Sequence, residues 1–211
     1  MVDDTRDRLL DAAGRIFAAK GVEQATIREI CGVAGANVAA VNYHFGDKMG
    51  LYKEAVKQAH CHHGEQPQFP WTDETPAAQK LEDFIRQLMT MMLDREQPSW
   101  HLELMMREMA RPSDACVELV RGFIGPMFEL LMAIVEPLLP ADATESDRQL
   151  YAFSIVAQCL LYRYHRPVGR LLVGEQRYQE LFDVERLTRH ITAFSLGGLH
   201  AGRTDRAETR S

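Results

Sequence analysis

Residues 35–48, GANVAAVNYHFGDK, combine small side chains with groups that can bind a DNA backbone. Tyr43 and His44 each join an apolar ring to a polar tip, which suits packing on a sugar and bonding a phosphate oxygen. Asn37 and Asn42 carry amides that can donate to or accept from base edges and phosphates. Together these residue types predict contact with a nucleic acid.

Small and charged residues nearby fit the same chemistry. A recognition helix lies in a major groove about 12 Å wide, so its approach face favours small side chains such as Ala39 and Ala40. Lys48 stands where a new helix is expected to begin, and Thr26 and Arg28 stand at the start of an earlier helix. Free N–H groups and the positive end of the helix dipole favour an anion there, so two helix N-termini are available for phosphates.

Short helices must position these side chains. The apolar spacing predicts a first helix that ends at Gly21. Thr26 and Asn37 are expected to cap two short helices separated by a turn at Gly35, and Asp47 to cap a longer helix. Two short helices joined by a tight turn and braced on each side form a helix-turn-helix unit. Such a pattern is weakly specific, and an ordinary helical hairpin with Tyr43 and His44 in its core also fits these letters.

The rest of the chain shows helical periodicity broken by prolines, without strand-like alternation. Amphipathic helices are predicted over residues 77–96, 100–111, 114–139, 146–166 and 183–199. The chain therefore predicts an all-α protein in which a three-helix DNA-binding domain precedes a larger helical body. We expect the helix-turn-helix domain over residues 1–62, a linker over 63–76, an effector-binding and dimerisation domain over 77–201 and a flexible tail over 202–211.

Composition limits the possible partners. The 211 residues carry a formal charge of −6, which argues against non-specific coating of nucleic acid. Residues 1–60 hold eight basic and eight acidic side chains, so a neutral N-terminal third could present a local anion-binding face. No apolar run is long enough for a membrane span and no secretory signal is visible. The widely spaced cysteines predict reduced thiols in a cytoplasmic protein: Cys31, Cys61, Cys116 and Cys159.

Residues 5–60 resemble the N-terminal domain of the TetR family of bacterial transcriptional repressors. The resemblance runs through RLLDAAGRIFAAKGVEQATIREICGVAGANVAAVNYHFGDKMGLYKEAV. The segments SWHLELMMREMARPSDACVELV, GPMFELLMAIV and QCLLYRYHRPVGRLL resemble the C-terminal domain of regulators related to the cefoperazone and chloramphenicol sensitivity regulator. The resemblance implies an all-helical homodimer whose C-terminal body binds a small effector and thereby releases the operator.

The same resemblance implies individual DNA contacts. It implies that phosphates are contacted by Thr26, Tyr43, His44 and Lys48. It also implies that the recognition helix faces the bases with Asn37, Val38 and Ala40. Arg28 could touch either a phosphate or a base. The family often has Ser at position 37 and Tyr at position 42, whereas this chain has Asn at both. Asn37 can still cap a helix, but the role of Asn42 stays open.

Polar residues inside apolar helical runs are candidates for an effector pocket. The polar candidates are His101, Arg107, Gln158, Tyr162 and His165, and the candidate apolar walls are Met105, Met106, Phe128 and Met132. The methionines can equally fill the core, and Arg107 can equally be structural. A homodimer needs a self-complementary apolar surface, for which the helices around residues 150–164 and 187–199 are the best candidates. Such a dimer predicts a pseudo-palindromic double-stranded operator.

The sequence leaves two other functions to consider beside DNA binding. His60 and His63, within the letters HCHH, could share a helix face, but two or three ligands at a helix end do not make a metal site. No metal or cofactor is therefore predicted. The chain lacks a nucleophile elbow, a phosphate loop and paired carboxylates, so no enzyme is predicted either. The competing hypothesis is a helical small-molecule or metal-sensing protein without DNA affinity. Repression rather than activation rests on the resemblance alone.

Overall fold

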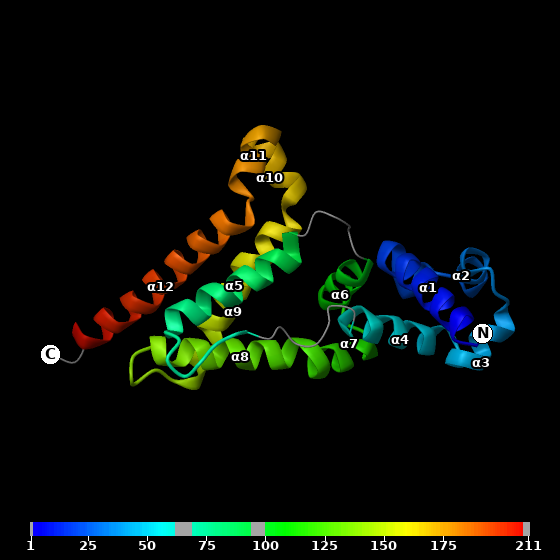
Figure 1. Cartoon of the computed structure of the whole chain (residues 1–211), viewed down its shortest axis with the longest axis horizontal. Coiled ribbons are helices and arrows are strands. Elements are labelled where there is room, and N and C mark those ends of the chain that lie inside the picture. The colour runs from blue at the N-terminus through cyan, green and yellow to red at the C-terminus, as the bar shows by residue number, and fades with distance from the viewer. Residues whose placement is uncertain (1, 62–68, 94–99, 209–211) are drawn as a thin grey trace. The chain divides into compact units, whose positions relative to one another are not determined.

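The structure is a computed structural model that describes residues 2–61, 69–93 and 100–208 (Figure 1). Every regular element within these ranges is helical, which confirms the predicted all-α class. None of the described helices combines the length and apolar character that crossing a bilayer requires. In chain order the elements are α1 (Val2–Gln24), α2 (Ile27–Ala34), α3 (Val38–Phe45), α4 (Lys48–Cys61), α5 (Ala77–Leu93), α6 (Trp100–Ala110), α7 (Asp114–Leu119), the π turn η1 (Val120–Ile124), α8 (Gly125–Val135), the 3-10 turn η2 (Glu136–Leu138), α9 (Glu145–Tyr164), α10 (Arg166–Val173), α11 (Glu175–Leu181) and α12 (Val184–Glu208).

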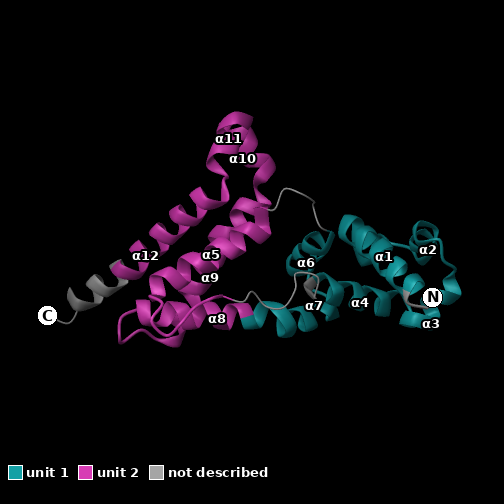
Figure 2. Cartoon of the chain, viewed as in Figure 1, with its two compact units in different colours: residues 1–66, 96–126 teal, residues 67–95, 127–211 magenta. Residues whose placement is uncertain are grey.

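Two compact units divide the chain (Figure 2). Unit 1 comprises residues 1–66 and 96–126, and unit 2 comprises residues 67–95 and 127–211. Helices α6 and α7 thus pack with α1–α4, whereas α5 packs with α9 and α12. The functional division into a DNA-binding domain, a linker at 63–76 and an effector domain stays a prediction.

Unit 1 is built around the apolar face of α1, whose Leu9, Leu10 and Phe17 are buried. Helical geometry breaks at Gly21, where the sequence predicts the end of this helix. The α6 helix lies very close to α1, because a Cβ atom added to Gly14 would come 2.3 Å from the ring of Trp100. Glycine at position 14 therefore permits this packing.

Unit 2 is built from α5, α9 and α12, which pack on one another (Figure 1). Burial of one face of α5, including Phe84 and Met89, explains its amphipathic pattern. At the start of α9, Thr144 and Asp147 form a reciprocal capping box. The Arg86 guanidinium on α5 donates to Glu185 on α12 at 3.0 Å, which adds a polar contact between these two helices.

Two helices depart from the sequence prediction. The sequence predicts one helix over residues 146–166, but α9 ends at Tyr164 and the hairpin of α10 and α11 follows. Pro167 ends the first helix and stands in the first turn of the next, where its missing N–H costs nothing. The predicted helix over 114–139 is also interrupted. The N–H of Gly125 donates to the carbonyl of Val120, which makes a π turn before Pro126.

Candidate nucleic-acid interface

Local capping builds α2 and α3 as predicted from the sequence. The Thr26 hydroxyl accepts a hydrogen bond from the Glu29 N–H at 3.2 Å, so α2 begins after Thr26. Gly35 then takes a left-handed conformation with φ 61° and ends this helix. The Asn37 side chain accepts from the Ala40 N–H at 2.8 Å and caps α3. These caps confirm the predicted pair of short helices and the turn between them.

One side of α3 is anchored and the other is open. Val41 is fully buried, whereas Val38 is 50% exposed, so Val41 is the residue that holds this helix to unit 1. Tyr43 is 81% exposed and therefore does not pack in a core. The half-buried His44 ring meets the Tyr43 ring edge-on, with centroids 4.9 Å apart. The phenol of Tyr43 is thus presented to solvent, as contact with DNA would require.

All ten residues predicted to contact DNA lie at the start of α2, on α3 with its N-cap, or at the start of α4. The exposed members are Thr26, Arg28, Asn37, Val38, Ala39, Asn42 and Tyr43, and the half-buried members are Ala40, His44 and Lys48. Which of them touch DNA stays a prediction.

Lys48 has partners within the protein. Its ammonium Nζ donates to the carbonyls of Ala25 at 3.2 Å and Glu23 at 3.4 Å, just before α2. Asp47 caps α4 by accepting from the Gly50 N–H at 2.7 Å, as predicted from the sequence. An ammonium has three N–H donors, so two carbonyl bonds leave one for a phosphate.

Two carboxylates near the DNA-binding helices of unit 1 are paired with cations. Glu29, in the first turn of α2, lies 2.6 Å from Lys20 Nζ. Glu54 on α4 lies 2.7 Å from the Arg6 guanidinium, which also sits over the Phe45 ring at 5.6 Å from its centroid. Pairing of these acids reduces the repulsion that they would exert on a phosphate backbone.

The effector-pocket candidates fall in both units. In unit 1, His101 is buried and stacks on Trp100, Met105 is buried, and Met106 is also buried. The Arg107 guanidinium donates to the carbonyls of Ala18 at 3.0 Å and Ala19 at 2.8 Å, near the end of α1. Periodicity could not reveal this contact, because its acceptors are backbone groups some 90 residues away, with separations of 89 and 88.

The other candidates belong to unit 2. The Phe128 ring contacts Phe153, and the half-buried Met132 lies one turn further along α8. Gln158 Nε2 donates weakly to Ser195 Oγ at 3.4 Å, while Tyr162 meets the Phe182 ring edge-on. Burial raises the pKa of Tyr162. His165 is exposed between α9 and α10. The effector pocket stays a prediction.

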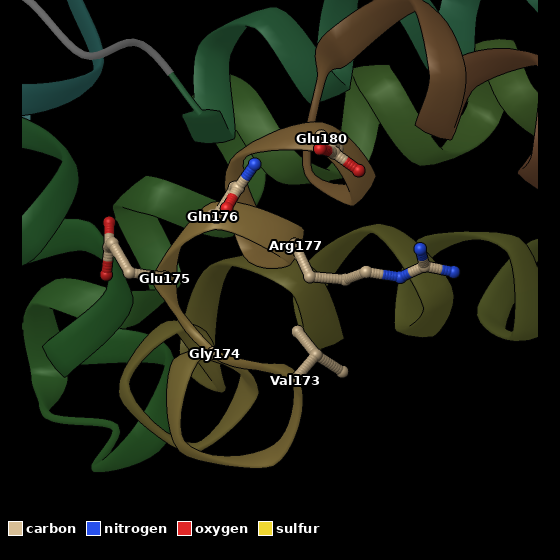
Figure 3. Close-up of a pocket in the computed structure, with 6 residues that line it drawn as sticks. All are labelled: Val173, Gly174, Glu175, Gln176, Arg177 and Glu180. Atoms are coloured by element: carbon tan, nitrogen blue, oxygen red, sulfur yellow. The ribbon is translucent and has the colours of Figure 1, made fainter.

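An open hollow of about 390 Å³ lies where α10 meets α11 (Figure 3). Charged groups dominate its lining, which comprises Val173, Gly174, Glu175, Gln176, Arg177 and Glu180. None of the predicted effector residues lines this hollow.

Apolar side chains face solvent on the two helices predicted to form a dimer. Phe153 on α9 is 61% exposed and Phe194 on α12 is 64% exposed. Further exposed residues on α9 are Leu150, Leu161 and Tyr164. The HCHH motif cannot be judged in the same way, because the side chains of residues 60–63 lie outside the described part. Among the side chains that the structure does describe, no three His, Cys, Asp or Glu form a group able to hold a metal ion.

Comparison with known proteins identifies relatives for both parts of the chain. A family model for the C-terminal domain of the HTH-type transcriptional dual regulator CecR matches residues 77–199, and one for bacterial regulatory proteins of the tetR family matches residues 9–55. CecR of Shigella flexneri is 22% identical over 188 residues, 84% of this chain and 84% of that protein. The HTH-type transcriptional repressor BepR of Brucella suis is 36% identical over 56 residues, which cover only 26% of this chain and 27% of BepR.

Solved structures resemble most of this chain. NalD, the secondary repressor of the MexAB-OprM multidrug efflux pump in Pseudomonas aeruginosa, has a TM-score of 0.62 and 21% identity, covering 94% of this chain and 98% of NalD. HlyIIR, a hemolysin II transcriptional regulator, has a TM-score of 0.61 and 20% identity, covering 91% of this chain and 99% of HlyIIR. At these identities the likeness concerns the fold alone.

Proposed function

We propose that this chain, which belongs to the TetR family of bacterial regulatory proteins and carries a CecR-type C-terminal domain, is a repressor that a small-molecule effector releases from its operator. Family membership makes the chain a DNA-binding transcriptional regulator and not an enzyme. It also favours this function over the alternative of a helical sensor without DNA affinity.

The open face of α3 is the observation that supports contact with the operator. Tyr43 and Asn42 are exposed there while Val41 anchors the opposite face, so the helix can enter a major groove without unfolding. In the proposed complex, phosphates are bound by Thr26, Tyr43, His44 and Lys48, bases are faced by Asn37, Val38, Ala39 and Ala40, and Arg28 and Asn42 reach either.

Two considerations support repression through a released operator. BepR and NalD are named repressors, whereas CecR is named a dual regulator. An effector that binds the C-terminal domain better in one conformation would shift the spacing of the two DNA-reading heads and lower operator affinity. The protein would act in the cytoplasm, where its DNA target lies.

A homodimer is the proposed assembly. Exposed apolar side chains on α9 and α12, above all Phe153 and Phe194, support a self-complementary surface. Two heads related by a two-fold axis would read a pseudo-palindromic operator whose half-sites lie about one helical turn apart.

A mobility-shift titration tests this proposal. The wild-type protein should form a salt-sensitive, sequence-specific complex with the DNA flanking its own gene. A protein-free cell extract should release labelled DNA if an effector controls binding. Absence of any specific complex would refute operator binding, and a complex unaffected by the extract would count against effector release.

A further inference from the structure

A buried carboxylate joins three helices of unit 1. Glu108 on α6 has no exposed surface, yet both of its oxygens are hydrogen-bonded. Oε2 accepts from the Tyr52 hydroxyl on α4. Oε1 accepts from the Ser113 N–H at 2.6 Å and from the Ser113 hydroxyl at 2.7 Å. Ser113 in turn caps α7 by accepting from the Ala115 N–H, so one side chain links α4, the end of α6 and the start of α7.

Stability alone gives a weak reason for such a carboxylate. Burying a carboxyl group is costly, and well-packed apolar residues are often equally stable in its place. Directional hydrogen bonds instead favour one arrangement of the helices that carry them. Burial and the hydrogen bond to Glu108 raise the pKa of Tyr52, so its hydroxyl keeps the proton that it donates. The pair therefore specifies how α4 is rotated and placed against α6.

The position of Tyr52 connects this pair to the DNA-binding face. Tyr52 lies one turn after Lys48 on α4, so both occupy the same side of that helix. The Lys48 ammonium is bonded to the carbonyls of Glu23 and Ala25, and the Tyr52 ring packs edge-on against Phe17 of α1. The first turn of α4 is therefore held at both ends by directional contacts.

We propose that Glu108 is a positioning residue for DNA binding: through Tyr52 it holds the first turn of α4, and with it Lys48, in the orientation that meets the phosphate backbone. The proposal rests on the proposed function, because it presupposes an operator complex. It assigns to α6 a part in DNA recognition without any contact between α6 and DNA.

Substitutions at both ends of the hydrogen bond test the proposal. Tyr52→Phe keeps the ring and removes the donor, and Glu108→Ala removes the acceptor. Each should weaken binding to DNA flanking the gene about tenfold, since the loss of a buried hydrogen bond is of that order. The double variant should bind no worse than Glu108→Ala, because the two act through one contact. Glu108→Gln should recover most of the affinity, since its amide can accept from Ser113 and donate to the Tyr52 oxygen.

A matched control separates positioning from simple loss of stability. Leu104 is fully buried one turn before Glu108 on α6, so Leu104→Val weakens the packing of this helix and leaves the hydrogen bonds in place. At a temperature where circular dichroism shows every variant folded, Leu104→Val should keep affinity within twofold of wild type. The proposal would be overturned if Tyr52→Phe bound DNA with wild-type affinity. It would also be overturned if Leu104→Val, with the same unfolding midpoint as Tyr52→Phe, lost as much affinity for DNA.

Hydrogen exchange supplies a readout that does not require DNA. Tyr52→Phe should speed amide exchange in residues 48–55. In Leu104→Val, the exchange rates of the same residues should stay closer to those of the wild-type protein. If the wild-type protein formed no specific DNA complex, the proposed function would fail, while unchanged exchange in Tyr52→Phe would refute the positioning role independently.

Discussion

The indole N–H of Trp100 donates to the Asp11 carboxylate at 3.0 Å and thereby joins the first turn of α6 to the middle of α1. The same ring lies directly over Gly14, one turn further along α1. A hydrogen bond and a close backbone approach thus act together where α6 meets α1. This relationship makes α6 part of the compact unit that carries the DNA-reading helices.

Adding one methyl group at this crossing should destabilise the protein. Gly14→Ala places its Cβ atom 2.3 Å from the Trp100 ring, so the helices must separate. We expect a loss of roughly 1–3 kcal/mol in the free energy of unfolding, measured by urea denaturation. Gly32→Ala is the matched control, because nothing lies within 4 Å of the added atom. Gly32→Ala should stabilise α2 by about 0.5–1 kcal/mol. Equal changes in the free energy of unfolding for the two variants would contradict the close crossing of α1 and α6.

The Asp11 carboxylate should make stability depend on pH. Burial raises its pKa, but the hydrogen bonds from Arg15 and Trp100 outweigh burial and leave the pKa below its usual 3.8. The stabilisation is therefore present above pH 3.8 and is lost as pH falls through the lower folded-state pKa. The midpoints of thermal unfolding of wild type and Asp11→Asn should differ most at neutral pH, where wild type is the more stable, and should converge in acid. A difference that grows in acid would contradict this sign.

Removing the Lys48 ammonium should weaken binding to every DNA sequence. Lys48→Ala should reduce the slope of log affinity against log salt by about 0.9, the value for one lost phosphate contact on duplex DNA. Fluorescence anisotropy across a salt series measures this slope. Lys57 is exposed further along the same helix, so Lys57→Ala should leave the slope unchanged. An unchanged salt slope for Lys48→Ala would show that the remaining N–H donor of the Lys48 ammonium does not contact the DNA backbone.

The exposed Tyr43 should matter for DNA and not for folding. Tyr43→Ala should change the free energy of unfolding by no more than about 0.5 kcal/mol, as is usual for exposed sites. Operator affinity should fall by about tenfold if the ring and hydroxyl contact the backbone. Val33 is also exposed, on α2, and is not a predicted contact, so Val33→Ala should bind like wild type. Equal affinity in both variants would remove Tyr43 from the interface.

Charges placed on the proposed dimer surface should separate the subunits. The double variant Phe153→Glu with Phe194→Glu should sediment as a monomer at micromolar concentration, because like charges would face each other across the two-fold axis. Leu172 on α10 is also exposed but lies outside the predicted surface, so Leu172→Glu should sediment like wild type. A wild-type monomer would contradict the dimer itself, and a dimer in the double variant would move the interface elsewhere.

Local rules account for what the sequence predicted well. Thr26 and Asn37 cap their helices because a cap needs only its own side chain and an N–H three residues later. Phe17 and Leu51 stand at helical spacing among other apolar residues, and both are buried. The TetR resemblance, carried by motifs within residues 5–60, is confirmed by the family matches.

Long-range contacts account for what was missed. Glu108 has no distinguishing pattern in the sequence, and its link to α4 depends on Tyr52, 56 positions earlier. The short helices α10 and α11 lack a side-chain cap, so the local signal that marks α2 and α3 is missing there. Asn42 is exposed on α3, which fits a DNA contact but leaves its partner in the complex unassigned.

The carbonyl bonds of Lys48 have a consequence for the thermodynamics of recognition. A free lysine side chain gives up much of its rotational freedom when a phosphate immobilises it. Here Ala25 and Glu23 restrict that freedom in the unbound protein, so the loss of entropy is incurred on folding rather than on binding. If Lys48 binds a phosphate as proposed, its ammonium is already oriented before DNA arrives, and more of its electrostatic attraction would be available as affinity.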